Sequence, residues 1–186
     1  MKIIKQAEKK TYKRSQEVSN IVSGIIDDVR NDGDKTLIDL AKKFDKIDIK
    51  NIKISRAQIE DAYTKVSKET VEYFKFAAKQ ITVYAEQQLK CLLPLNFHSE
   101  VPGLELGHRL VPVDRCGCYV PSGRYPLPST ALMSILPAKI AGVKHVAACS
   151  PPFAGYGTIH PAVLVAMDIA GADEIYCMGG AQAVAA

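Results

Sequence analysis

The sequence contains no long apolar run, no strong excess of one charge and no even set of cysteines. Its apolar runs are far shorter than the ~18 residues of a membrane-spanning helix, so we expect no membrane partner. Lys and Arg number 24 against 20 Asp and Glu, a net charge of +4 without a basic stripe, so we expect no nucleic-acid partner. Five cysteines, an odd number, indicate buried thiols and not a disulfide framework. No apolar signal core follows the first positive charges, and we therefore expect a cytoplasmic protein.

Several motifs that mark catalytic or cofactor sites are also missing. The chain has no Gly-x-Gly-x-x-Gly fingerprint, no serine nucleophile elbow and no phosphate-gripping lysine after a glycine-rich loop. The four histidines are scattered, with no His-x-x-x-His on any predicted helix. Cys116 and Cys118 are too close in sequence for the usual Cys-x-x-Cys zinc knuckle, and we interpret them as structural thiols.

The two halves of the 186-residue chain differ sharply in composition. Residues 1–93 carry 33 charged residues, two glycines and no proline, whereas residues 94–186 carry 11 charged residues, ten glycines and all ten prolines. We expect a helical N-terminal region over 1–93 and a turn-rich region with alternating strands and helices over 94–186.

Apolar spacing in the first half predicts four amphipathic helices. Gly33 is a suitable stop for the first helix, and Asp34 a suitable N-cap for the second. Ser55 with Gln58 forms a capping box for the third. The fourth, of some twenty residues, should turn one face to the core, composed of Val71, Phe74, Ala78 and Ile81. Alternation over residues 47–54 favours a short exposed strand.

The second half follows a strand, turn and helix order three times. Short apolar runs near 118–120, 145–149 and 175–178 predict buried strands. Ser129 or Thr130 could cap the first intervening helix, and Pro161 lies in the first turn of the second. This alternation predicts a parallel βαβαβ layer, an incomplete Rossmann-like α/β fold. A last helix starts near 181 and stops after about one and a half turns, so we expect the sequence to be part of a longer one.

Ligands of such a sheet bind at the carboxyl ends of the strands, here the loops at 121–126, 150–152 and 179–182. Tyr119 could present its ring and hydroxyl to a cofactor, or be a core aromatic. Gln182 could present its amide to a ribose or base, or be a solvated helix residue. Gly179 and Gly180 could let a phosphate approach or only make a tight turn. Arg124 could bind an anion or simply be exposed.

Several segments of the chain closely resemble the histidinol dehydrogenase family. The similarity covers nearly the whole chain, in blocks that occur in the right order: residues 31–37, 43–45, 113–133, 137–143, 149–152 and 170–186. The last block contains Gly-Gly-Ala-Gln-Ala, and the block at 113–133 contains Gly-Cys-Tyr-Val-Pro.

The resemblance implies a zinc-dependent enzyme that oxidises L-histidinol to L-histidine in two NAD-dependent steps, acts on a small amino alcohol and forms a homodimer. It implies that Tyr119 and Gln182 bind NAD, on an incomplete Rossmann domain without the usual glycine fingerprint. The family's zinc ligands and catalytic Glu-His pair would follow Ala186, so we expect no catalytic residue, no metal ligand and no activity in this chain alone. Ser122 stands where the family usually has glycine, which would weaken cofactor binding if that position required a positive φ or a close approach of the cofactor.

Two alternatives stay open. The loop at 123–126 and the segment at 170–176 resemble dehydrogenases of the sulfopropanediol type at least as well. A paralogue that oxidises another polar alcohol is therefore the second hypothesis, and a truncated, non-catalytic product is the third.

Overall fold

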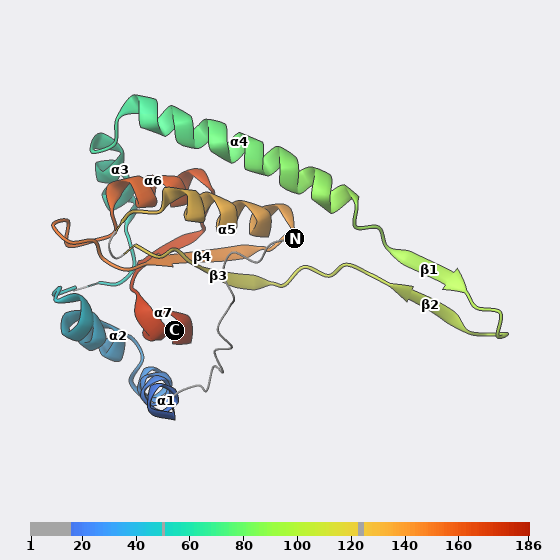
Figure 1. Cartoon of the computed structure of the whole chain (residues 1–186), viewed down its shortest axis with the longest axis horizontal. Coiled ribbons are helices and arrows are strands. Elements are labelled where there is room, and N and C mark those ends of the chain that lie inside the picture. The colour runs from blue at the N-terminus through green and yellow to red at the C-terminus, as the bar shows by residue number, and fades with distance from the viewer. Residues whose placement is uncertain (1–15, 50, 123–124) are drawn as a thin grey trace, which may run out of the picture.

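A computed structural model describes residues 16–49, 51–122 and 125–186 of the chain. Helices come first and alternate with strands in the second half, so the predicted α/β class is confirmed (Figure 1). The elements in chain order are α1 (Gln16–Asp32), α2 (Asp34–Leu40), the π-helical turn η1 (Ala41–Asp45), α3 (Arg56–Thr64), α4 (Lys68–Lys90), β1 (Leu95–His98), β2 (Glu105–His108), β3 (Arg115–Tyr119), α5 (Pro128–Ile140), β4 (His145–Ser150), α6 (Pro161–Ile169), β5 (Glu174–Cys177) and α7 (Gly180–Ala185).

The centre of the molecule is a parallel sheet with the strand order β3-β4-β5. The connecting helices α5 and α6 lie on one side of this sheet, with α3 and α4 packed over them, and α1, α2 and α7 lie on the other side (Figure 1). Tyr119 is in register with Cys149, and Ser150 with Cys177. All three strands therefore end at one edge, which brings the loops that follow them together.

The predicted inward face of the long helix is confirmed in α4. Ala78 is buried, and Val71, Phe74 and Ile81 pack against the core. Burial of this apolar face against α5 is the main force that holds the helix to the body, because helix propensity alone is weak.

The helix caps agree with the sequence in one case and differ in two. Ser55 and Gln58 form the predicted capping box of α3. Asp34 is wrong as an N-cap: it is the first residue of α2, and Gly33 with φ 56° lies before it. Because glycine adopts a positive φ readily, α1 can end and α2 begin within one residue. Ser129 and Thr130 are also wrong as caps, because α5 begins earlier, at Pro128. The fixed φ of proline suits the first turn of a helix.

The exposed strand predicted over 47–54 is wrong. In the described part of this segment only a short antiparallel contact forms, along the outer edge of β5. The Ile54 amide donates to the Ile175 carbonyl (2.8 Å), and the Cys177 amide donates to the Ile52 carbonyl (2.7 Å). Three of the four isoleucines in the segment are buried. The segment covers one edge of the sheet and contributes its apolar side to the core.

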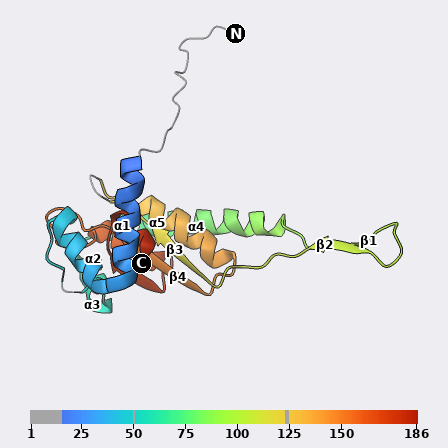
Figure 2. The same ribbon diagram turned by 90° about the horizontal axis from the view of Figure 1, so that it is seen from below.

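A two-stranded arm was missed in the sequence. β1 and β2 pair antiparallel and project away from the body in both views (Figures 1 and 2). Gly107 is required there, because a Cβ atom at this position would lie 2.2 Å from the Leu95 carbonyl oxygen. Every residue of both strands is exposed, so neither shows the one-sided burial by which a strand is recognised.

Both halves of the chain contribute to one hydrophobic core. Hydrogen bonds between α6 and α3 also join the two halves. Asp168 on α6 accepts hydrogen bonds from Arg56 Nη1 (2.6 Å) and from the Tyr63 hydroxyl (2.8 Å) on α3. Burial, and then this bond, raise the pKa of Tyr63 to about 12. The division at residue 93 stays a prediction. Of the helices in the described ranges, none is long and apolar enough to cross a membrane.

Candidate functional site

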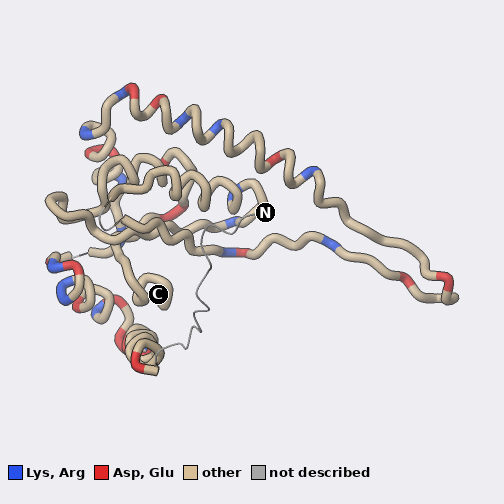
Figure 3. The backbone as a smooth tube through the Cα atoms, viewed as in Figure 1, with Lys and Arg blue, Asp and Glu red and all other residues tan. Residues whose placement is uncertain are grey.

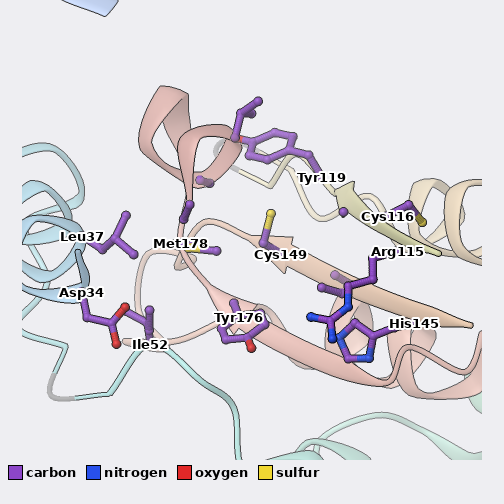
Figure 4. Close-up of a pocket in the computed structure, with 16 residues that line it drawn as sticks. Asp34, Leu37, Ile52, Arg115, Cys116, Tyr119, His145, Cys149, Tyr176 and Met178 are labelled. Atoms are coloured by element: carbon purple, nitrogen blue, oxygen red, sulfur yellow. The ribbon is translucent and has the colours of Figure 1, made fainter. Parts of the chain in front are cut away.

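The carboxyl edge of the parallel sheet holds both predicted cofactor residues. Tyr119 ends β3 and is 38% exposed, so it is not a buried core aromatic. Its hydroxyl accepts a hydrogen bond from the Gly180 amide at 3.3 Å. Figure 4 shows the ring pointing from β3 toward α7. The phenol therefore lies at the start of the helix that carries Gln182.

Gln182 is a buried residue of α7, only 4% exposed, which excludes the alternative of a solvated helix residue. Its side chain folds back over the turn: a Cβ atom on Gly180 would lie 2.7 Å from Gln182 Oε1. Among the described residues, its amide has no hydrogen-bond partner. Tyr119 and Gln182 thus both lie next to Gly180, although 63 positions separate them in the sequence.

Gly179 and Gly180 each have a structural reason to be glycine. A Cβ atom on Gly179 would lie 2.5 Å from Pro151 Cβ in the neighbouring strand-end loop. Gly180 has a φ of 70°, in the left-handed region that favours glycine. The tight-turn interpretation of this pair is therefore sufficient by itself. A cofactor role for this turn depends on the side chains around it.

Two serine hydroxyls at the same edge escaped the sequence analysis. Ser150 is the last residue of β4 and Ser122 follows β3, and they are 0% and 1% exposed. Neither Oγ atom has a hydrogen-bond partner among the residues that the structure describes. A buried hydroxyl without a partner costs about 1–3 kcal/mol, so such groups are found where a ligand or an ordered water satisfies them. The signal in the sequence was a serine within two positions of the end of each of these two predicted strands.

The backbone at Ser122 answers one of the two concerns about the family's glycine, the need for a positive φ. Ser122 does not have a positive φ, so the serine is not strained there. Arg124, the other candidate in this loop, lies outside the described residues.

Three of the five thiols are buried as predicted, whereas Cys91 is exposed and Cys116 is half-buried. Burial raises the pKa of Cys118, Cys149 and Cys177 to about 11, so all three stay protonated near neutral pH. Within the described ranges, no three His, Cys, Asp or Glu side chains lie close enough together to share a metal ion.

Charged groups gather at the opposite, amino-terminal edge of the sheet. Glu174 accepts hydrogen bonds from Lys53, from His145 Nε2 (3.1 Å) and from the Tyr176 hydroxyl (2.9 Å). The bonds from Lys53 and Tyr176 lower the pKa of Glu174 to about 2. Each acceptor oxygen is used within the protein, which indicates a structural network and not a catalytic one.

A cavity of about 690 Å³ lies between these two edges, against the sheet face opposite α5 and α6. Its walls are mostly apolar, with Leu37, Cys149 and Met178 among them, and Leu37 lies at one end and His145 at the other (Figure 4). Gln182 does not line it. The candidate cofactor site is therefore the strand-end edge, and the cavity is a space between this face of the sheet and helices α2 and α7.

The chain is similar along almost its whole length to one family of proteins. Residues 8–186 match the profile of the family described as Histidinol dehydrogenase. Histidinol dehydrogenase from Methanothermobacter thermautotrophicus is 44% identical over 166 residues, which cover 89% of this chain and 38% of that protein. Histidinol dehydrogenase homolog 1 from Mesorhizobium japonicum is 39% identical over 169 residues, 91% of this chain and 33% of that protein.

A solved structure is similar as well. The crystal structure of histidinol dehydrogenase from Elizabethkingia anophelis superposes with a TM-score of 0.82 at 32% identity, over 98% of this chain and 40% of that chain. The chain thus spans 33–40% of the length of these three relatives.

Proposed function

Because this chain belongs to the histidinol dehydrogenase family, we propose that it forms the NAD-binding part of an enzyme that oxidises L-histidinol to L-histidine. NAD, when bound, accepts a hydride in each of two successive oxidations. The contribution of this chain is to bind and orient the dinucleotide at the carboxyl edge of its parallel sheet.

The observation that carries the proposal is that the side chains of Tyr119 and Gln182 both lie next to Gly180. Tyr119 offers a partly exposed ring and a hydroxyl, and Gln182 offers an amide that has no bond to another described residue. A nicotinamide dinucleotide carries aromatic rings, ribose hydroxyls and phosphate oxygens, which such groups can stack on or hydrogen-bond. Ser122 and Ser150 add two hydroxyls without described partners at the same strand ends.

The test is isothermal titration of NAD into the chain and its variants. Gln182→Ala should weaken NAD binding by ~1 kcal/mol, about fivefold in Kd, the net value of one hydrogen bond. Tyr119→Phe keeps the ring but removes the acceptor for the Gly180 amide, and should weaken binding to a similar degree. Gln80→Ala, on the exposed surface of α4, is the matched control and should bind NAD as the unmodified chain does.

Two results would contradict the proposal. One is a chain that binds no NAD at all; the other is unchanged affinity in both site variants. Far-UV circular dichroism of each variant shows whether an altered affinity reflects a lost contact or a lost fold.

The remaining parts of the proposal come from the family. We propose that the complete enzyme also needs zinc, works in the cytoplasm as a homodimer and takes a small amino alcohol as its substrate. NAD binding is common to histidinol and other polar-alcohol dehydrogenases, so the substrate is tested separately, by the absorbance of NADH formed with L-histidinol and with sulfopropanediol.

A further inference from the structure

The loop between β4 and α6, residues 151–160, gathers three aromatic rings beyond the ends of the parallel strands (Figure 1). The ring of His160 contacts those of Phe153 and Tyr156 in edge-to-face arrangements, with ring centroids 4.9 and 5.1 Å away. Tyr156 is 46% exposed, whereas Phe153 and His160 are half-buried. One ring therefore lies at the surface, and the two others support it from below.

Backbone contacts hold this loop in one shape. The Phe153 amide donates to the Thr158 carbonyl (2.8 Å), and the Tyr156 amide donates to the Phe153 carbonyl (3.1 Å). Gly155 and Gly157, with φ of 86° and 67°, lie in the left-handed region that favours glycine, so the chain can turn back sharply there. The aromatic rings are therefore already in place before a flat ligand arrives, which lowers the entropy cost of binding it.

His160 offers an unused hydrogen-bond donor beside these rings. Its Nδ1 atom accepts a hydrogen bond from the Ala162 amide (3.2 Å) and caps α6. Burial lowers the pKa of His160, so the imidazole is neutral near pH 7 and carries its proton on Nε2. Among the described residues, nothing accepts a hydrogen bond from Nε2. The loop thus combines an exposed aromatic ring with a neutral N–H donor.

A purine base fits these groups better than the other parts of a dinucleotide do. No Lys, Arg, Asp or Glu occurs between Lys144 and Asp168, and the loop is neither blue nor red in Figure 3, so it has no charge to bind a phosphate. Every base can stack on an aromatic side chain. The ring nitrogens of a purine can also accept a hydrogen bond from Nε2 of His160, whereas the ring nitrogen of nicotinamide is bonded to ribose and cannot.

The loop is adjacent to the candidate cofactor site. It begins at Pro151, which packs against the turn before α7: a Cβ atom on Gly179 would lie 2.5 Å from Pro151 Cβ. In doubly wound sheets the phosphates lie at the turn after the first strand, and the ribose of the adenosine half lies at the end of the next strand. Here those strands are β3 and β4, which are neighbours in the sheet. An adenosine that extends from Tyr119 past the end of β4 would reach this loop.

We propose that Phe153, Tyr156 and His160 form a purine-binding site, which holds the adenine of NAD. This inference rests on the proposed function and identifies the end of the dinucleotide that the loop binds. The adenine ring stacks on Tyr156, and His160 Nε2 donates a hydrogen bond to one of the ring nitrogens. The nicotinamide end then lies on the opposite side of the strand-end edge, toward β3.

The two halves of NAD, AMP and nicotinamide mononucleotide, separate the ends in calorimetric titrations. Tyr156→Ala removes the exposed ring and should raise the Kd of AMP and of NAD about tenfold. Tyr156→Phe keeps the ring and should bind both as the unmodified chain does. His160→Asn keeps an N-cap acceptor for α6 but removes the Nε2 donor, and should raise both Kd values about fivefold.

The Kd of nicotinamide mononucleotide should stay the same in all three variants, which also shows that they are folded. The matched control is Tyr84→Ala on α4, where the tyrosine is 68% exposed and lies outside the loop. This variant should bind AMP and NAD with unchanged affinity.

The outcomes separate this site from the proposed function. NAD binding that Tyr156→Ala and His160→Asn both leave unchanged would overturn the purine site and leave NAD binding in place. Equal losses for AMP and for nicotinamide mononucleotide would overturn the assignment of the loop to the adenine end. A loss in Tyr156→Phe as large as in Tyr156→Ala would overturn stacking on this ring. A chain that binds neither AMP nor NAD would overturn both proposals.

Discussion

Gly179→Ala perturbs the candidate site through one methyl group. The added Cβ would lie 2.5 Å from Pro151 Cβ and 3.2 Å from Pro151 Cα. The φ of Gly179, −136°, is ordinary for alanine, so the penalty is purely steric. Because Pro151 is rigid and one of the two contacts is backbone, the loops after β4 and β5 must separate. Overpacking of this kind costs about 1–3 kcal/mol.

Thermal and urea unfolding, followed by circular dichroism, measure the effect. A loss of ~2 kcal/mol should lower the Tm by roughly 4–8 °C in a chain of this size. The matched control is Gly24→Ala in the middle of α1, where no atom beyond the neighbouring helix backbone lies within 4 Å of the new Cβ. That variant should gain ~0.5–1 kcal/mol, because alanine favours the helix.

NAD titration of the same variant connects stability with the proposed site. Separation of the two loops should also move Gln182 away from Tyr119 and weaken NAD binding. Gly179→Ala with the stability of the unmodified chain would refute the steric reasoning. A destabilised variant with full NAD affinity would refute the link between this turn and the cofactor.

Two further predictions concern the polar contacts that join the halves and the strands. Asp168→Asn should lower the free energy of unfolding by ~1–3 kcal/mol, because it weakens the hydrogen bonds from Arg56 and Tyr63. In spectrophotometric titration, the pKa of Tyr63 should fall from about 12 but stay raised by burial. The pKa of Glu174 is lowered from 4.5 to about 2, so the carboxylate stabilises the fold fully above pH ~4.5 and loses this effect as the pH falls toward 2. Glu174→Gln should remove this part of the acid sensitivity, as measured by urea unfolding at pH 2–7.

The sequence was informative where structure depends on near neighbours. The Ser55 capping box needs only a serine and a glutamine three positions apart, and it forms as predicted. The three parallel strands were predictable for a similar reason, because short apolar runs between turns favour buried strands. The shared strand edge then brought Tyr119 near α7, as expected of any parallel sheet.

The missed features depend on contacts between distant parts of the chain. Nothing in the spacing of residues 47–54 shows that β5 would pair with them, which is why buried isoleucines were predicted as an exposed strand. The burial of Ser150 Oγ without a hydrogen-bond partner likewise depends on how distant segments pack around the end of β4, which the local sequence does not show. The arm was missed because both strands are only four residues long and fully exposed, so neither contributes to the buried core by which strands are recognised.

The two outer strands of the parallel sheet differ in whether another strand can pair with them. The segment around Ile54 is bonded along the outer side of β5 and closes that edge. Within the described chain, β3 pairs with β4 alone, so the backbone of its other side is open. A further parallel strand can therefore join only beside β3. The sheet, which grows from β3 through β4 to β5, would then extend in the opposite direction from β3, and the point of reversal would lie next to Tyr119. In doubly wound sheets that point of reversal is where the ligand crevice opens, so the strand that sets the direction of sheet growth also lies at the candidate cofactor site.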